Sequence, residues 1–162
     1  DPQATPEGLA EMDVRTPVHG ELDLTDRGGV LRVGYWGFDG DINAEIVNER
    51  TLRLTAAAFA RKRILPVTFT PNIRLVPGTP LVTGAGAEVA VDGSPIALDA
   101  ADTGGWIGQG RWRITMPAGA AFTYPYRPRI HVEPDAATVD QMYALLAIPV
   151  GAEPVAVEIR IE

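Results

Sequence analysis

The sequence predicts an all-β fold: a two-sheet β-sandwich or jelly roll of about eight to ten strands, with one amphipathic helix near the C-terminus. Seventeen glycines and fourteen prolines are spread along the 162 residues and cut the chain into short segments. Most of these segments alternate apolar with polar residues, which is typical of half-buried strands. The chain contains no internal repeat and no long linker, so we expect residues 1–162 to form a single domain.

The composition excludes several classes of protein. Lys and Arg number 14 against 21 Asp and Glu, so the formal charge is -7 and the average field repels nucleic acids and anionic membranes. We expect no membrane span, because no apolar run is long enough for one. The absence of cysteine excludes disulfides, thiolate zinc sites and cysteine nucleophiles. Because the first residue is Asp1 rather than methionine, we expect that a preceding segment has been removed.

Residues 1–13 are predicted to form an N-terminal extension or a short helix. Thr5 precedes Pro6 in the arrangement of a helix cap followed by the first helical position, and such a helix would reach Met12, although Gly8 weakens it. The predicted strands that follow in this half of the chain are Glu21–Leu24, Val30–Phe38, part of Ala44–Arg61, Ile64–Phe69 and Ile73–Val76.

The segment after Asp41 fits two alternatives. Ile42, Ile46 and Val47 follow the spacing of a helix that Asp41 would cap, whereas Thr51–Thr55 alternates as a strand does. We favour strand after Asn48.

A tight hairpin is predicted where Asp92-Gly93 separates two apolar runs, because this dipeptide tolerates the backbone angles of a primed turn. Its two strands would be Glu88–Val91 and Pro95–Leu98. Further strands are predicted over Arg111–Met116, Phe122–Tyr126 and Ile130–Val132.

The last part of the chain is predicted to contain the helix and a final strand. Residues 135–148 read as an amphipathic helix, because Val139, Met142, Tyr143 and Leu146 fall at i, i+3, i+4 and i+7. The stretch Val155–Ile161 alternates strictly and is predicted to be a half-buried strand.

Gly34-Tyr35-Trp36 resembles the Gly-x-Trp motif of lipocalins. That family also carries a late helix, and the resemblance implies a barrel that binds small apolar molecules; the rest of this chain lacks the family's even run of eight hairpin strands. A simpler interpretation of the same stretch is a buried strand from Val30 to Phe38 that ends in a polar turn.

Asp39-Gly40-Asp41-Ile42-Asn43 resembles the start of an Asp-x-Asp-x-Asn calcium loop. The sixth position is Ala44 where that loop needs glycine, and the twelfth is Arg50 where it needs glutamate. We therefore favour a polar turn in which Asp41 acts as a cap, and we predict no metal site.

Arginine and aromatic residues gather in two of the predicted strands. Alternation places the arginines on the outer face of each strand, where guanidinium groups could bind carboxylates and aromatic rings could stack on sugars. The alternative is a solvated face whose arginines pair with the many acidic residues. The candidate ligand-binding residues are Trp106, Arg111, Arg113, Tyr126, Arg129 and His131.

Candidate catalytic groups are few. Histidine occurs only at positions 19 and 131, which excludes a histidine-rich metal centre within one chain, and Ser94 is the only serine. Carboxylates that could act as an acid and a base are Asp39, Asp41, Glu45 and Glu133, but no spacing singles out a pair. No cofactor is predicted.

The sequence thus favours a non-catalytic binding or assembly module that recognises an anionic small molecule or oligosaccharide. A structural subunit of a homo-oligomer is the first alternative, because sandwich domains associate through strand edges. A small enzyme with carboxylate acid-base chemistry in a β cavity is the second.

Overall fold

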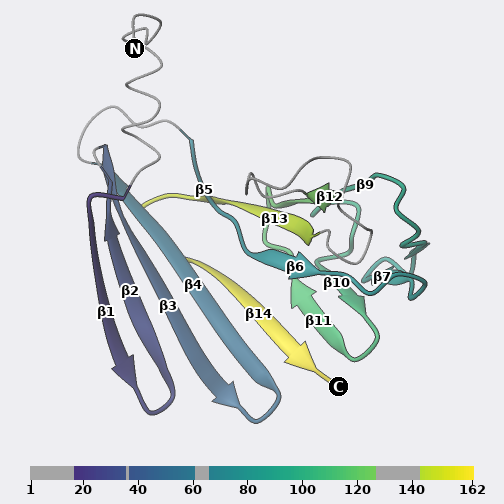
Figure 1. Ribbon diagram of the computed structural model, residues 1–162, viewed down its shortest axis with the longest axis horizontal. Coiled ribbons are helices and arrows are strands. Elements are labelled where there is room, and N and C mark those ends of the chain that lie inside the picture. Colours follow the sequence, from purple (N-terminus) through teal and green to yellow (C-terminus); the bar gives the residue numbers. More distant parts are fainter. Residues whose placement is uncertain (1–16, 36, 61–65, 127–142) are drawn as a thin grey trace, which may run out of the picture. The chain divides into compact units, whose positions relative to one another are not determined.

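The computed structural model describes residues 17–35, 37–60, 66–126 and 143–162, and these form strands and turns without any helix. Hydrogen bonding groups the strands into two antiparallel sheets of nine and five strands (Figure 1). The prediction of an all-β fold is therefore confirmed for this part of the chain. The strands outnumber those predicted, and β7 (Leu81–Thr83) and β10 (Trp106–Gln109) are examples of short strands that were not predicted. Within the described ranges no helix exists that could span a membrane.

The chain divides into two compact units. The first comprises Asp1–Val67 and Val150–Ala156, and the second comprises Thr68–Pro149 and Val157–Glu162. The interpretation of residues 1–162 as a single domain stays a prediction.

The first unit contains an antiparallel meander of four strands (Figure 1): β1 (His19–Thr25), β2 (Gly28–Gly34), β3 (Phe38–Asn48) and β4 (Thr51–Ala60). Its turns are held by side chains. The Arg27 guanidinium donates to the main-chain oxygens of Ile46 at 2.8 Å and Val47 at 2.7 Å, and Asn48 Oδ1 accepts from Arg50 N at 2.9 Å.

The two faces of this meander differ in polarity, because opposite residues of antiparallel strands share a face. One cross-strand row joins Leu22, Leu31, Ile42 and Ala56, whereas the neighbouring row joins Glu21, Arg32, Asp41 and Ala57. Ion pairs on the polar face link Arg32 to Asp23 and Arg53 to Glu45. The large apolar side chains that remain strongly exposed in this region are Val18, Leu22, Leu24, Ile46 and Phe59.

The predicted strand from Val30 to Phe38 is wrong in its extent, and so is the polar turn at Asp41. Strand β2 ends at Gly34, Tyr35 N donates to Phe38 O at 2.8 Å, and the two rings stack with centroids 4.5 Å apart. Asp41 lies within the eleven-residue strand β3, opposite Arg32 in β2 and Ala57 in β4. Pairing on both sides stabilises this polar segment as a strand despite its turn-forming residues.

The second unit contains the remaining strands apart from a few end residues, Val67, Val150 and Val155–Ala156, which belong to the first unit. One group is hydrogen-bonded in the order β14-β11-β10-β7-β8, and the other in the order β5-β13-β12-β9, with β6 also paired to β13. Their bounds are β5 (Val67–Phe69), β6 (Asn72–Arg74), β7 (Leu81–Thr83), β8 (Glu88–Val89), β9 (Ile96–Asp99), β10 (Trp106–Gln109), β11 (Trp112–Thr115), β12 (Ala121–Tyr126), β13 (Tyr143–Val150) and β14 (Val155–Ile161).

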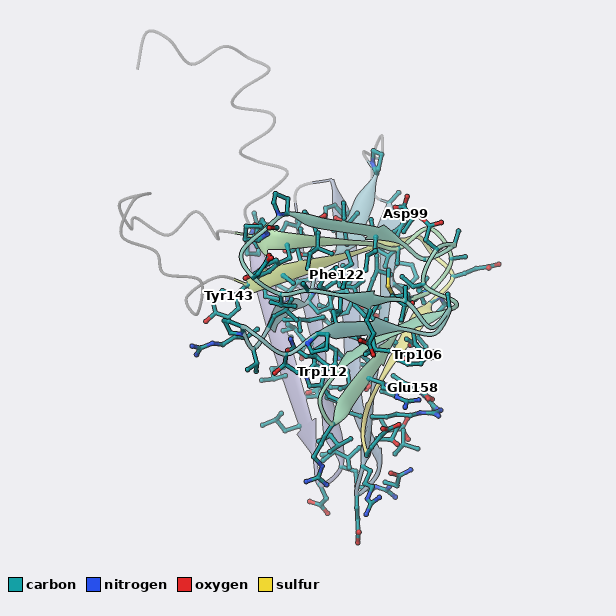
Figure 2. The ribbon with its side chains drawn as sticks, turned by 90° about the vertical axis from the view of Figure 1, so that its right-hand side faces the viewer. Asp99, Trp106, Trp112, Phe122, Tyr143 and Glu158 are labelled. Atoms are coloured by element: carbon teal, nitrogen blue, oxygen red, sulfur yellow. The ribbon has the colours of Figure 1, made fainter. Side chains whose placement is uncertain are left out.

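Alternate residues of both strand groups form the core of this unit. In the first group Leu81, Ile107 and Ile114 are at least 98% buried, and in the second Phe122 and Leu146 are fully buried. Figure 2 shows Phe122 among the interior side chains, whereas Asp99 lies at the outside. This alternation confirms the predicted strands Arg111–Met116, Phe122–Tyr126 and Val155–Ile161 to within one or two residues at each end.

The predicted C-terminal helix over residues 135–148 is wrong for its last six residues. Tyr143–Val150 is strand β13, which pairs with β12 and β6. Ala144, Leu146 and Ile148 are buried at every second position, which is the period of a strand. The prediction of a helix rested on the spacing of four residues. Hydrogen bonding to antiparallel strands on both sides stabilises the strand instead. Residues 135–142 lie outside the described part of the chain, as do the N-terminal extension and the predicted strand Ile130–Val132.

The hairpin predicted around Asp92-Gly93 is also wrong, although the turn exists. β8 pairs with β7 and β9 pairs with β12, so the two flanking strands belong to different sheets. Asp92 Oδ1 accepts from Ser94 N at 2.9 Å, and Gly93 has a φ of 97°. Asp92 does not have the positive φ that a type I′ turn requires, so the chain passes from one sheet to the other.

Candidate binding site

The candidate site lies on the hairpin formed by β10 and β11. Its turn is Gly110-Arg111, with Gly110 at a φ of 60°, and its register pairs Gly108 with Arg113. Ile107 and Ile114 also pair, and they point into the core. The alternate residues Trp106, Gly108 and Arg113 therefore share the outer face of the hairpin.

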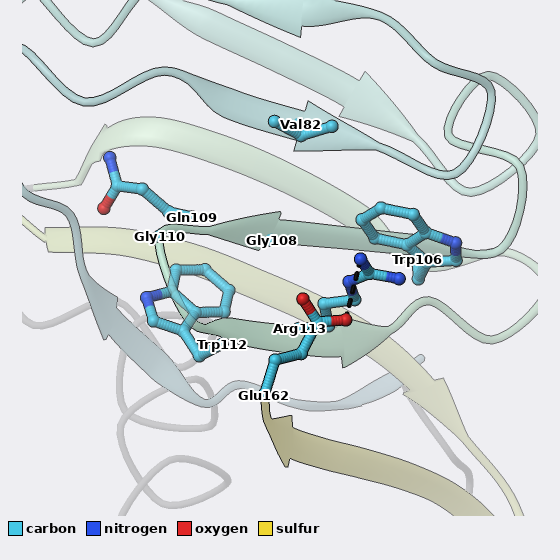
Figure 3. A pocket seen from close by; sticks show the side chains of 8 residues that line it. All are labelled: Val82, Trp106, Gly108, Gln109, Gly110, Trp112, Arg113 and Glu162. Carbon is cyan, nitrogen blue, oxygen red and sulfur yellow. Dashed lines mark ion pairs between the residues drawn. The ribbon is translucent and has the colours of Figure 1, made fainter.

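Arg113 is held between an indole ring and a carboxylate. Its guanidinium carbon lies 4.4 Å from the centre of the Trp106 ring, and its Nη2 lies 2.7 Å from Glu162 Oε1 (Figure 3). The Arg113 side chain is nevertheless 46% exposed. Because a guanidinium carries five N–H donors, a second acceptor could bind Arg113 without displacing Trp106.

A shallow depression of about 100 Å³ opens beside this pair (Figure 3). Gly108 lies in its wall, where a Cβ atom would come within 2.6 Å of Trp112 O and 3.0 Å of Arg113 Cγ. Only glycine fits there. Pockets that enclose a drug-sized ligand hold several times this volume, so the depression suits a ligand that lies on the surface. Its lining residues are Val82, Trp106, Gly108, Gln109, Gly110, Trp112, Arg113 and Glu162.

Trp106 also packs against Gly84 in the loop after β7. A Cβ atom on Gly84 would lie 2.6 Å from Trp106 Nε1 and 2.6 Å from the main-chain oxygen of Gly104. The glycine therefore leaves the space that the pyrrole edge of the indole fills.

Arg111 supports the site from the side. Its Nε donates to the main-chain oxygen of Glu162 at 2.9 Å, and Glu162 N donates to Arg111 O at 2.7 Å. These bonds fix the main chain of Glu162 and so position its carboxylate beside Arg113. Arg111 is a positioning residue rather than part of the lining.

The six candidate residues are only partly brought together. Trp106 and Arg113 form the site, and Arg111 adjoins it through Glu162. Tyr126 belongs to β12, where it pairs with Tyr143, and it does not line the depression. Arg129 and His131 lie outside the described residues.

Sequence reasoning missed six of the lining residues, and Glu162 and Gly108 are the two that shape the site around Arg113. Glu162 follows the strictly alternating strand β14, whose pairing with β11 places it beside Arg113. No local pattern indicates which strand lies next to β14. The glycines around Trp106 were the available signal for Gly108, because a glycine within a strand often marks a close approach.

The candidate acid-base residues do not form a site. Asp39, Asp41 and Glu45 follow one another along one face of β3, where Asp41 faces Arg32 and Glu45 pairs with Arg53. Glu133 is outside the described ranges. Within those ranges no three His, Asp or Glu side chains gather as the ligands of a metal ion do.

A comparison of the chain with protein-family models, curated proteins and solved structures finds no match. What the protein binds is therefore inferred from the geometry of its own residues.

Proposed function

We propose that the chain is a non-catalytic binding module, a β-sandwich whose depression at Trp106 and Arg113 recognises an acidic, carbohydrate-like ligand. The observation that carries the proposal is the ion pair of Arg113 with Glu162 beside an indole ring. The carboxylate of Glu162 occupies the position that a ligand carboxylate would take.

The chemistry of the lining supports this class of ligand. Arg113 supplies donors for a carboxylate, while Val82 and Trp106 supply apolar surface against which the carbon face of a sugar can lie. The carboxylate of a ligand competes with Glu162 for Arg113. Because an exposed ion pair contributes only about 0–1 kcal/mol, replacing Glu162 by the ligand carboxylate costs little free energy. We expect weak, salt-sensitive binding that needs several sugar units.

The same lining argues against catalysis at this place. Among the described residues that line the depression, Glu162 is the one carboxylate, and it is ion-paired with Arg113. Acid-base hydrolysis of a glycoside requires a second carboxyl group across the scissile bond.

The test is a titration with oligogalacturonate, followed by tryptophan fluorescence and calorimetry, with a neutral oligosaccharide as reference. Wild type should bind the acidic oligomer and not the neutral one, and high salt should weaken the binding of the acidic oligomer. Arg113→Gln should abolish it, whereas Arg53→Gln removes an equal charge in the first unit and should leave it unchanged. Equal loss in both variants, or no binding by wild type, would refute the proposal.

A structural subunit of a homo-oligomer is the second candidate, and a separate observation favours it. Leu22 and Leu24 are 59% and 76% exposed on the apolar face of the first unit, and Ile46 on the same face is 47% exposed. Such side chains suit burial against a second copy. Light scattering of wild type and of Leu22→Thr/Leu24→Thr distinguishes the two candidate functions. A structural subunit should be an oligomer as wild type and a monomer as the variant, whereas a binding module should have the same mass in both.

A further inference from the structure

We propose that the outer edge of β1 binds an extended peptide segment of a partner protein, in which basic and apolar side chains alternate. The partner would add a strand beside β1. This inference is independent of the site at Trp106.

Among the described residues, strand β1 is an open edge. It stands at the end of the strand order of its sheet, and all seven of its residues are exposed. In an edge strand every second residue directs its N–H and C=O away from the sheet, and these groups form a template for another strand.

Three usual obstacles to edge pairing, which are a bulge, a proline and a lysine, are missing from β1. Its register with β2 runs without a bulge from His19 to Thr25, and the segment HGELDLT contains neither proline nor lysine. A Cβ atom on Gly20 would meet nothing within 4 Å among the described residues, so the face of the strand is open at this position.

The charge beside this edge is negative. Glu21 and Asp23 share one face, and their side chains are 58% and 57% exposed. Asp23, which hydrogen-bonds Arg32, is the main cause that raises the pKa of that guanidinium, and the charges of Glu21 and Asp41 add to it. Three carboxylates thus share one arginine, and a basic side chain on an added strand would balance the excess.

The acids also disfavour pairing of β1 with a second copy of itself. Opposite residues share a face in an antiparallel pair, and each symmetric register that overlaps most of the strand sets a carboxylate against a carboxylate. In the three registers, Glu21 of one copy lies opposite Glu21 of the other, Glu21 lies opposite Asp23, or Asp23 lies opposite Asp23. Like charges directly opposite each other are destabilising. A basic partner meets no such repulsion.

The opposite, apolar face of β1 determines which side chains the partner carries at its alternate positions. Leu22 and Leu24 point to that face and are 59% and 76% exposed. Apolar side chains on the added strand would lie next to them and exclude water, which gives the alternating pattern.

The test uses a capped peptide that alternates arginine with valine, with fluorescence anisotropy as the readout. Two reference peptides carry glutamate in place of arginine or N-methyl groups on alternate amides. The basic peptide should bind, and both references should fail, because one repels the acids and the other cannot donate to the edge. Amide exchange should slow within His19–Thr25 and not in β10 or β11.

Glu21→Gln/Asp23→Asn should weaken binding about five-fold, as expected for the loss of two exposed charge pairs. Glu49→Gln/Glu153→Gln removes the same charge from turns and should have no effect. Equal weakening in both variants would show that the peptide is attracted by the net charge of the protein and not by the edge of β1, and it would overturn the proposal. So would binding of the N-methylated peptide, or a dimer of the protein that protects β1 without any peptide.

Discussion

The side-chain amide of Gln109 pairs with the main chain of Val76 as a neighbouring strand would. Gln109 Oε1 accepts from Val76 N at 2.8 Å, and Nε2 donates to Val76 O at 3.0 Å. Nε2 also donates to Thr79 O at 2.7 Å, and the glutamine is only 3% exposed. One buried amide thus joins β10 to the loop between β6 and β7.

Replacement of Gln109 by leucine should lower the free energy of unfolding by about 2–3 kcal/mol, because three hydrogen bonds are lost and main-chain groups of the loop lose their partners. Denaturant titration measures the change. Val76→Ala is the matched control: its side chain is 57% exposed and its main chain is kept, so its effect should be small. Equal effects in the two variants would contradict this role of the amide.

Tyr124→Phe should leave the protein as stable as wild type at neutral pH, or more stable by up to about 1 kcal/mol. Tyr124 is 1% exposed, and its hydroxyl has no hydrogen-bond partner among the described residues. A loss of more than that amount in denaturant titration would show that the hydroxyl is paired.

The same variant should change the response to alkali. Burial, followed by the charge of Asp92, raises the pKa of Tyr124 above its ordinary value of 10.0. The unfolded chain therefore loses this proton first, and wild type loses stability as the pH rises above 10.0. Unfolding curves of Tyr124→Phe should lack that part of the alkaline loss, and Tyr143→Phe should retain it.

Gly84→Ala should displace the indole of Trp106 and destabilise the protein by about 1–3 kcal/mol, because the new methyl group would overlap Gly104 O and Trp106 Nε1. Tryptophan emission and denaturant titration report the two effects. Gly20→Ala serves as the control, since a Cβ there meets nothing within 4 Å. Unchanged emission in Gly84→Ala would show that the indole does not rest on this glycine.

Asp92→Ala should destabilise the turn at neutral pH, and the difference from wild type should shrink in acid. The backbone N–H of Ser94, followed by its hydroxyl, lowers the pKa of the Asp92 carboxyl below its ordinary value of 3.8. Its contribution is complete above 3.8 and is lost as the pH falls through the lowered value. Asp92→Asn keeps the acceptor and should not show this acid dependence; unfolding midpoints across the acid range test both variants.

Alternation was sufficient to predict where most strands lie, but not how they pair. Val155–Ile161 could be predicted because its apolar residues recur at every second position. β8 and β9 flank a turn and still join different sheets, since pairing depends on partners distant in sequence. β13 shows the limit of short windows, where four residues satisfied a helical spacing that antiparallel partners override.

For the site, residue types were more informative than residue order. Arg113 could be selected because alternation places it on an outer face, and Trp106 because it is an aromatic residue near the arginines in sequence. Tyr126 was grouped with them by proximity in sequence, yet it belongs to another sheet. Glu162 could not be found, since only the pairing of β14 with β11 brings it to Arg113.

The first unit is not a continuous stretch of polypeptide, since it combines Asp1–Val67 with Val150–Ala156. Ala58 N donates to Gly151 O at 2.8 Å across that interval. A ribosome adds roughly 5–20 residues per second, so the meander emerges on the order of ten seconds before the segment that completes it. During that interval the leucine side chains of the meander stay accessible to chaperones at the ribosomal exit tunnel.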